Sequence, residues 1–545
     1  MNAPWHDLNR AAVRPSRVLQ AWQGPQARHA AAAQAGRLEQ QQRAYEGAAV
    51  NRLTGDWMAP NTSADSELLT SLRLMRARSR ELVRDNPFAK QVVRVIRNNV
   101  IGEGIGMQAQ VKSAGGVLQK GVNDSIEDAY CNWADKRYCH TAGLLGMADI
   151  EQLAMVQLVT AGEVIVRKIR QPFGGGRIPL ALEVIEADRL LDNWQTAHAP
   201  NGNIIRMGVE IDTWHRPVAY WFSPQHPGDY QFATFEPSRF MRVPAEDILH
   251  LYIIDRWPQT RGEPWFHATL RSLRDEGGLV EAETVKARAS ANIVGFIKSP
   301  EPVAADGVIN GRQVIDTEPG LWQRLLPGED VAGMSSYAPN PSLDPFLRYM
   351  VRKICVGVGP SYESVSRDYS QSNYSSTRMG QLDDRSLYRI LQGFFIRNFR
   401  RDIHREFMDA AALVGAVKVG ADYYGNAVKY QAVRFKPRGW SWIDPAKEVL
   451  AYKMAVRCGF MTQGDVIAQT SQDSDLEDVL DRRQEELQMS DERELIFDTD
   501  SRVVNDKGQA QPAPLDAGAD EKALGAMVGE TDASEGGAAA QGSDK

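Results

Sequence analysis

Few patterns in this sequence could support enzymatic chemistry. Residues 102–106 hold three alternate glycines that resemble the start of a dinucleotide-binding loop, but residues 107–110 alternate like a strand instead of opening a helix. A Walker A phosphate loop is excluded, because no glycine in the chain is followed by a lysine. The pair Asp383-Asp384 lies where we expect a helix to begin, and carboxylates there favour the helix dipole. These patterns therefore indicate a turn and a helix end.

Nucleophilic and metal chemistry find no better support. The nine histidines form no His-Glu-x-x-His motif, and we expect His250 and His404 in particular to be structural. The four cysteines include no Cys-x-x-Cys pair, and no Gly-x-Ser-x-Gly nucleophile turn occurs. The sequence therefore predicts a protein that is not an enzyme and has no catalytic residues, no cofactor and no metal site.

The composition restricts the class of protein further. The 545 residues carry 63 Lys and Arg against 70 Asp and Glu, a formal net charge of −7. This balance argues against a uniformly basic nucleic-acid coat but permits a local basic patch. Hydrophobic residues make up 43% and charged residues 24%, the proportions of a folded soluble protein. No apolar run approaches the roughly 20 residues of a membrane-spanning helix, and we therefore expect no membrane partner.

Both ends of the chain differ in composition from its middle. Residues 1–53 are rich in Ala, Gln and Arg without a clear apolar stripe, and we interpret them as a mobile arm. Residues 495–545 are rich in Gly, Ala, Ser and acidic residues, so they cannot bury enough apolar surface to offset the entropy of ordering. We expect this acidic tail to be disordered.

Hydrophobic periodicity predicts the first elements between these ends. Residues 65–100 have helical spacing that is interrupted at Asn86-Pro87, which predicts two consecutive helices. Short runs with strand composition follow, separated by glycine-containing turns: 164–166, 182–185, 207–211 and 218–222. We expect this region to form mostly antiparallel sheet.

The rest of the folded chain is predicted to be mainly helical. Residues 265–294 place small and apolar side chains on one face, which packs either within its own chain or laterally against copies in an oligomer. Asp344, as N-cap, and Pro345 predict the start of a helix that ends near residue 358. A long helix is predicted over 377–414, with these side chains facing inward: Leu387, Ile390, Leu391, Phe394, Phe395, Phe399, Ile403 and Phe407. Its arginines are assigned to the polar side: Arg385, Arg389, Arg397, Arg400, Arg401 and Arg405.

Several short segments occur in the same order as the motifs of one viral family. They are Gly162-Glu163 and residues 182–190, 208–210, 216–221, 243–250, 259–262, 326–329, 361–378 and 442–448. As an ordered set they resemble the lambda-type bacteriophage portal proteins over about residues 60–495. Trp257-Pro258 departs from the Pro-Gly that the family pattern has before Gln259, which affects the turn expected there.

The resemblance implies an α+β portal fold with a β-rich wing, a helical stem, a small clip and a helical C-terminal crown. The implied parts are the wing at 54–264, the stem helices at 265–294 and 343–358, the clip at 295–342, a tunnel loop at 359–376, a long wing helix with return strands at 377–433, and the crown at 434–494.

The resemblance also implies a function. Portal proteins form a ring, with twelve subunits expected here, at one capsid vertex, and double-stranded DNA is packaged and ejected through it without sequence preference. The implied partners are further copies of the chain, the terminase large subunit, the major capsid and scaffold proteins, and head-completion or neck proteins. The implied location is the portal vertex of the virion, after assembly in the bacterial host cytoplasm.

Two sets of residues become candidates for this function. The DNA-facing candidates in the tunnel loop are Arg367, Asn373, Tyr374 and Arg378, although Tyr374 and Arg378 could equally hold the loop against the helix that follows it. The candidates for packing between stem helices of adjacent subunits are Leu273, Gly277, Val280, Ala287 and Ala291.

Three other functions are weighed against this interpretation. Another phage head or neck protein, such as an adaptor, is the main alternative, although adaptors are usually much shorter. A maturation protease would need a nucleophile beside a base, and no such arrangement is visible. A nuclease or terminase component would need an acidic metal cluster or a Walker A loop, and the sequence shows neither.

Overall fold

The computed structural model describes residues 59–197, 201–229, 240–292, 342–440, 445–470 and 476–493, the short strands between 296 and 332, and isolated positions 52, 199, 495 and 497. The chain divides into two units, Met1–Glu67 and Leu68–Lys545, and the contacts below lie within the second. The expected arm, most of the clip and the acidic tail fall outside the described residues. No described helix has the length and hydropathy that a membrane span requires.

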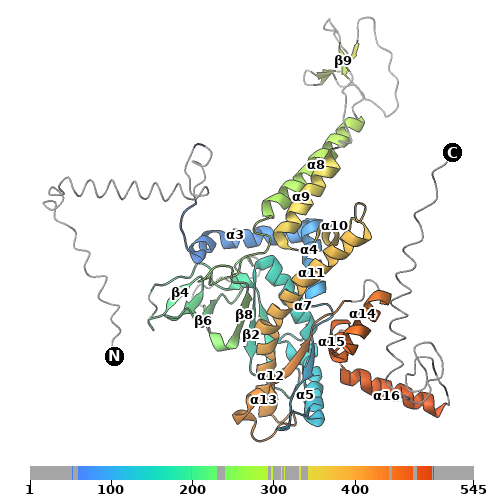
Figure 1. Cartoon of the computed structure of the whole chain (residues 1–545). Coiled ribbons are helices and arrows are strands. Elements are labelled where there is room, and N and C mark those ends of the chain that lie inside the picture. The colour runs from blue at the N-terminus through green and yellow to red at the C-terminus, as the bar shows by residue number, and fades with distance from the viewer. Residues whose placement is uncertain are drawn as a thin grey trace, which may run out of the picture. The chain divides into compact units, whose positions relative to one another are not determined.

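Helices and short strands alternate along the described chain (Figure 1). The helices are α3 Ala64–Asp85, α4 Pro87–Val100, α5 Lys120–Trp133, α6 Lys136–Cys139, α7 Met147–Ala161, α8 Leu270–Asn292, α9 Leu343–Val358, α10 Tyr362–Ser366, α11 Tyr374–Phe395, α12 Arg401–Leu413, α13 Ala427–Tyr430, α14 Pro445–Arg457, α15 Gln463–Thr470 and α16 Leu476–Glu492. The strands are β1 Gly106–Ala109, β2 Glu163–Ile169, β3 Ala181–Ile185, β4 Ile204–Arg206, β5 Val209–Ile211, β6 Pro217–Phe222, β7 Met241–Pro244, β8 Ile248–Tyr252, β9 Phe296–Lys298, β10 Val308–Ile309, β11 Arg312–Gln313, β12 Asp330–Ala332 and β13 Val433–Lys436.

Two antiparallel sheets form the β-rich part, as the sequence predicts. The first has the order β3-β2-β8 and the second β4-β5-β6-β7, and every strand pair within them is antiparallel. The strand expected over 207–211 begins only at Val209, because Met207 and Gly208 both have positive φ and form a turn. A third pair joins β1 to β13, which lies more than three hundred residues later.

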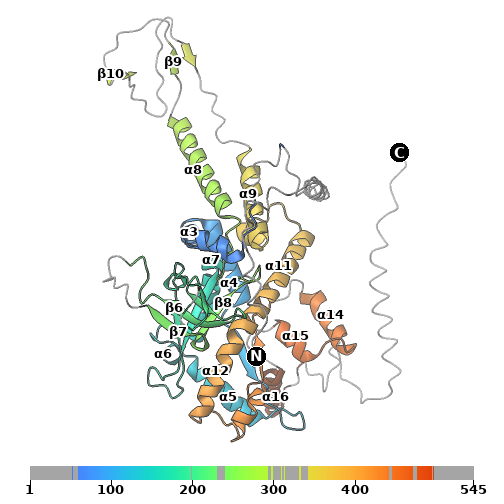
Figure 2. The same cartoon turned by 90° about the vertical axis from the view of Figure 1, so that its left-hand side faces the viewer.

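The junction between α3 and α4 confirms the break expected at Asn86-Pro87. The Asn86 side-chain oxygen accepts hydrogen bonds from the backbone of Phe88 (2.9 Å) and Ala89 (3.1 Å), and Pro87 occupies the first helical position. The amide nitrogen of the same side chain donates to Glu276 on α8 at 3.1 Å. The cap residue therefore also attaches the base of α8, which lies beside α9 in two orthogonal views (Figures 1 and 2).

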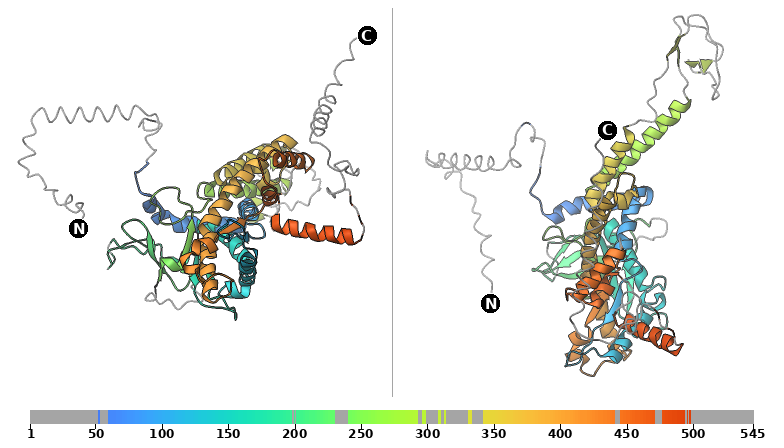
Figure 3. Two further views of the ribbon diagram at one scale, coloured as in Figure 1. Left: turned by 60° about the horizontal axis from the view of Figure 1, so that its bottom comes forward. Right: turned by 45° about the vertical axis from the view of Figure 1, so that its right-hand side comes forward.

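The long helix expected over 377–414 is present as α11 and α12, joined by a π-helical turn, Ile396–Arg400 (Figure 3). Most of its predicted inward residues are buried, but two assignments are wrong. Ile390 is 66% exposed, and Arg400 is only 2% exposed. The extra residue in a π turn rotates the helix face that follows it, which brings Arg400 inward.

Buried Arg400 is compensated within the core. Its Nε lies 2.9 Å from Glu151 of α7, and its Nη2 donates to the carbonyl of Ile105 at 2.8 Å. The guanidinium also lies over the ring of Tyr130, and the tyrosine hydroxyl lies within contact of it. A buried charge with an opposite charge and hydrogen bonds is tolerated where an unpaired one is not.

His404, one turn after Arg400, gives a pH-dependent prediction. Burial, with Arg400 nearby, lowers the pKa of His404 from 6.5 to about 3. Between these values the unfolded chain binds a proton that the folded chain does not, so the free energy of unfolding decreases as the pH falls. We expect His404→Leu to make this dependence shallower by about 1.4 kcal/mol per pH unit between about pH 6 and 4, measured by chemical denaturation.

Phe407→Leu is the matched control, because it alters the same core without removing a titratable group. It should lower stability by a similar amount at every pH and leave the pH dependence unchanged. An unchanged slope in His404→Leu would contradict the prediction.

Candidate functional site

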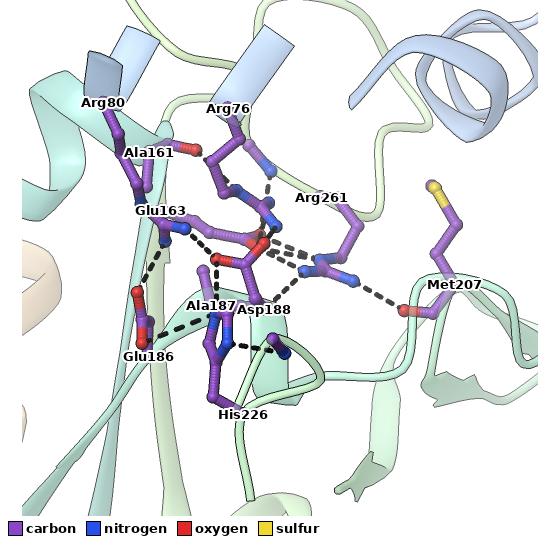
Figure 4. Close-up of polar contacts among 12 residues, drawn as sticks. Arg76, Arg80, Ala161, Glu163, Glu186, Ala187, Asp188, Met207, His226 and Arg261 are labelled. Carbon is purple, nitrogen blue, oxygen red and sulfur yellow. Dashed lines mark hydrogen bonds and ion pairs between the residues drawn. The ribbon is translucent and has the colours of Figure 1, made fainter. Parts of the chain in front are cut away.

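A buried ion-pair cluster occupies the β-rich part, centred on Glu163, the first residue of β2 (Figure 4). The Glu163 carboxylate lies 2.8 Å from Arg76 Nη2 of α3 and accepts two bonds from Arg261 Nε at 3.0 and 2.9 Å. His250 Nε2 of β8 lies 2.9 Å from its second oxygen. All four side chains are at most 3% exposed. This one carboxylate therefore joins α3, both paired strands β2 and β8, and the segment that precedes α8.

Electrostatics within the cluster favours the ionised carboxylate. Burial alone would raise the pKa of Glu163, but Arg261 and Arg76 outweigh this effect and hold that pKa well below its usual range. Burial lowers the pKa of His250, although its hydrogen bond to Glu163 opposes that shift. The prediction that His250 is structural fits this arrangement.

Two glycines permit the close backbone approach that the cluster requires. A Cβ at Gly162, where φ is 87°, would lie 2.2 Å from the carbonyl carbon of Glu263. A Cβ at Gly262 would lie 2.1 Å from the carbonyl oxygen of Gly162. The backbones cross in direct contact, which leaves no space for a side chain at either position. This explains why glycine precedes Glu163 and follows Arg261 in the sequence.

The cluster extends outward through Asp188. Arg76 Nη1 lies 3.3 Å from Asp188, Arg80 also contacts Asp188, and Arg80 lies 3.1 Å from Glu186. The ring of His226 lies 3.8 Å from both carboxylates (Figure 4). Glu186, Asp188 and His226 have the spacing of a metal site, but the two guanidinium groups already neutralise the carboxylates. We therefore interpret the group as an ion-pair network.

Arg261 connects the two sheets. Besides Glu163, it donates to the carbonyls of Met207 (2.8 Å) and Ala187 (3.1 Å). Met207 belongs to the turn before β5 in the second sheet, so a single guanidinium positions both sheets relative to α8.

The cluster brings together segments that the sequence analysis quoted only as motifs. Glu163, Asp188, His250 and Arg261 each come from a different one of them. The sequence analysis missed Arg76. The available signal was its position, four residues after Leu72 on the apolar stripe of α3. An arginine at a core position of an amphipathic helix predicts a buried carboxylate partner, but not which one.

The segment expected to be a tunnel loop is partly helical. Residues 362–366 form α10, and α11 begins at Tyr374, not at residue 377. Asn373 caps α11, because its side-chain oxygen accepts from the backbone of Ser376 at 2.8 Å. Asp384 does not lie at the helix start as expected; it is buried in α11 and accepts from the hydroxyl of Ser361 at 2.7 Å.

Three of the four DNA-facing candidates lie in this segment, and Arg378 follows two residues after it in α11. Arg367 is exposed, has a left-handed backbone (φ 57°) and ends α10. Tyr374 is 59% exposed at the first turn of α11, and Arg378 is half-buried one turn later. Arg352 of α9 holds the segment from the other side, with its guanidinium 5.1 Å from the ring centre of Tyr362. Asn373 thus has a structural role, and contact with DNA stays a prediction for all four.

The stem candidates on α8 have different environments. Leu273 is fully buried within its own chain, whereas Val280 is 39% exposed. Gly277 and Ala287 are exposed, and a Cβ added at Gly277 would meet nothing within 4 Å. The side chain of Ala291 lies outside the described residues. The four candidates with described side chains therefore do not share one buried face within the chain. Their packing against another subunit stays a prediction.

Known phage proteins are similar to this chain over much of its length. The family model described as phage portal protein, lambda family, matches residues 50–392. The probable portal protein of Halomonas phage phiHAP-1 is 29% identical over 444 residues, covering 79% of this chain and 84% of that protein. Portal protein B of Escherichia phage lambda is 20% identical over 365 residues, covering 59% and 66%. The solved neck of an empty GTA particle has a TM-score of 0.40 at 14% identity, covering 73% of this chain and 93% of that one.

Removal of the central charge tests the ion-pair cluster. We expect Glu163→Gln to lower the free energy of unfolding by about 3–5 kcal/mol, because Arg76 and Arg261 would stay buried without their shared counter-charge. Thermal or chemical denaturation of the full chain measures this. Exposed Glu81→Gln on α3 makes the same chemical change and should stay within about 0.5 kcal/mol. Equal stability of both variants would show that the fold does not depend on the cluster.

Proposed function

This chain belongs to the lambda family of phage portal proteins, and we propose that it assembles into a ring of twelve subunits at one vertex of the capsid. In that ring it would conduct double-stranded DNA during packaging and ejection. The observation that carries this proposal is the family match over residues 50–392, which spans the ion-pair cluster, α8, α9 and most of α11.

In this function the chain would have a structural role, and its partners would carry out the chemical reactions. ATP hydrolysis would come from the terminase large subunit, because no glycine in this chain is followed by a lysine. Major capsid and scaffold proteins would surround the ring, and head-completion or neck proteins would replace the motor after packaging. The site of action would be the portal vertex of the virion, after assembly in the host cytoplasm.

Within the ring, α8 and α9 are proposed to form the stem, and residues 359–376 to face the channel. The exposed side of α8 supports the first assignment, since Gly277 and Ala287 are exposed and Val280 is 39% exposed. The exposed cation of Arg367 and the exposed ring of Tyr374 support the second. Few such contacts suit a conduit, because each tight phosphate contact would resist sliding.

The mass of the purified chain distinguishes this function from that of an adaptor. Twelve chains of 60.6 kDa give about 730 kDa, and negative-stain images should show an axial hole. A chain that stays monomeric at every salt concentration, even with its scaffold protein present, would contradict the ring.

A bulky residue in the stem tests the packing face. Gly277→Leu and Gly278→Leu each add a side chain to open space on α8, and each should stabilise the isolated helix slightly. We expect only Gly277→Leu to prevent ring formation, measured by mass photometry, because Gly277 lies on the proposed face. Normal rings in both variants would show that this face of α8 is not part of the subunit interface.

Charge removal in the channel segment tests DNA contact. We expect Arg367→Ala and Arg378→Ala to leave rings intact and to reduce the DNA packaged by the terminase motor several-fold. Arg73→Ala, an exposed change on α3, is the control and should package normally. Loss of rings in Arg367→Ala or Arg378→Ala would instead assign these residues a structural role.

A further inference from the structure

An arginine-rich surface lies where the end of α4, the middle of α11 and residues 438–440 meet. Arg97 donates to the side-chain oxygen of Asn98 at 3.0 and 2.9 Å, and Arg438 contacts the carbonyl of the same asparagine. Gln392 of α11 donates to the carbonyls of Asn99 (3.2 Å) and Arg438 (3.0 Å). These bonds hold three segments that are far apart in sequence at one fixed place.

Trp440 orders two further arginines at this place. Its indole nitrogen donates to Asn99 at 3.1 Å, which fixes the ring. The guanidinium groups of Arg385 and Arg389 lie 5.9 and 5.7 Å from the centre of its ring. Burial lowers the pKa of Arg385, the charge of Glu448 on α14 opposes this shift, and the charge of Arg389 adds to it.

Arg397, in the π-helical turn after α11, continues the surface. A Cβ at Gly393 would lie 3.1 Å from an Nη atom of Arg397, so the guanidinium lies close to this glycine. On α4, Lys90 and Arg94 are exposed at helical spacing before Arg97, and the whole helix contains no acidic residue. The two helices thus bring basic stripes to the same junction.

We name Arg97, Arg389, Arg397 and Arg438 the arginine seam. None of them forms an ion pair with a carboxylate among the residues that the structure describes. This distinguishes the seam from the cations of the core, such as Arg76 and Arg400, which are paired with acids. It also differs from an ordinary solvated basic face, because Asn98 binds the guanidinium of Arg97 and the ring of Trp440 packs against the guanidinium of Arg389.

Ordered guanidinium groups without internal counter-ions favour binding of an external polyanion. Arg389 on α11 and Arg397 in the π-helical turn that follows it are eight residues apart, a rise of about 12 Å at helical spacing. We propose that the arginine seam binds the phosphate backbone of duplex DNA, as a second contact separate from residues 359–376. The choice of DNA as the polyanion rests on the proposed function, whereas the requirement for a polyanion rests on the seam alone.

The test uses the full-length chain and a fluorescent duplex of mixed sequence, with binding followed by anisotropy over a series of salt concentrations. Each variant is first checked for assembly by mass photometry and for folding by circular dichroism. We expect Arg389→Gln combined with Arg397→Gln to weaken binding about tenfold or more at roughly 0.1 M salt. The slope of log affinity against log salt should become shallower by about 2, because two phosphate contacts are lost.

Two comparisons make the result specific. Arg73→Gln combined with Arg78→Gln removes the same charge from exposed positions on α3 and should bind as the unchanged chain does. Arg389→Lys combined with Arg397→Lys keeps the charge and should retain most of the affinity, since a phosphate accepts bonds from either cation.

Folded seam variants that bind duplex with unchanged affinity and slope would overturn the proposal. An equal loss in the α3 control would overturn it too, because binding would then follow net charge and not the seam. Failure of the unchanged chain to form rings is read from the mass measurement. That result bears on the proposed function, whereas the DNA titration of the seam can succeed or fail independently of it.

Discussion

One buried carboxylate, Glu163, determines how the elements of the β-rich part are arranged. A charge removed from water is stable only if opposite charges and hydrogen bonds surround it. Here those partners come from α3, β8 and the segment before α8, so the cluster is satisfied only when all of these elements are in place. Hydrophobic burial is non-directional and would tolerate several arrangements, whereas this set of bonds accepts one.

The attachment of α8 follows from the same cluster. Arg261 binds Glu163, and the chain then passes Gly262, which touches the backbone of Gly162, before it enters α8. Asn86, at the other side of α8, is bonded to Glu276 in its second turn. The base of α8 is therefore held at two points by polar contacts, while most of the described side chains between residues 280 and 288 are exposed. A helix that is fixed at its base and bare above it is suited to pack against a neighbouring copy.

Local patterns in the sequence predicted much of this fold, but they predicted few of its long-range polar contacts. The break at Asn86-Pro87 and the antiparallel strands were correct, because caps, turns and periodicity act over a few residues. Arg400 was assigned to the polar side, because no pattern in the sequence predicted the π turn that brings it inward. Ile390, which precedes that turn, was assigned to the inner face from helical spacing alone and is exposed. Asn373 was assigned to a loop, although Asn with Ser376 three residues later is also a helix-start pattern.

The distribution of positive charge decides what a chain with net charge −7 can do with DNA. Several arginines, among them Arg76 and Arg261, are neutralised inside the fold and contribute nothing to an external field. Arg367 and the four arginines of the seam are among the cations that form no ion pair with a carboxylate in the described part of the chain, and they lie at separate places. Each weak phosphate contact adds to affinity and to salt dependence, but also to resistance against sliding. A protein that must hold DNA and still let it move is better served by a few separated contacts than by a basic surface.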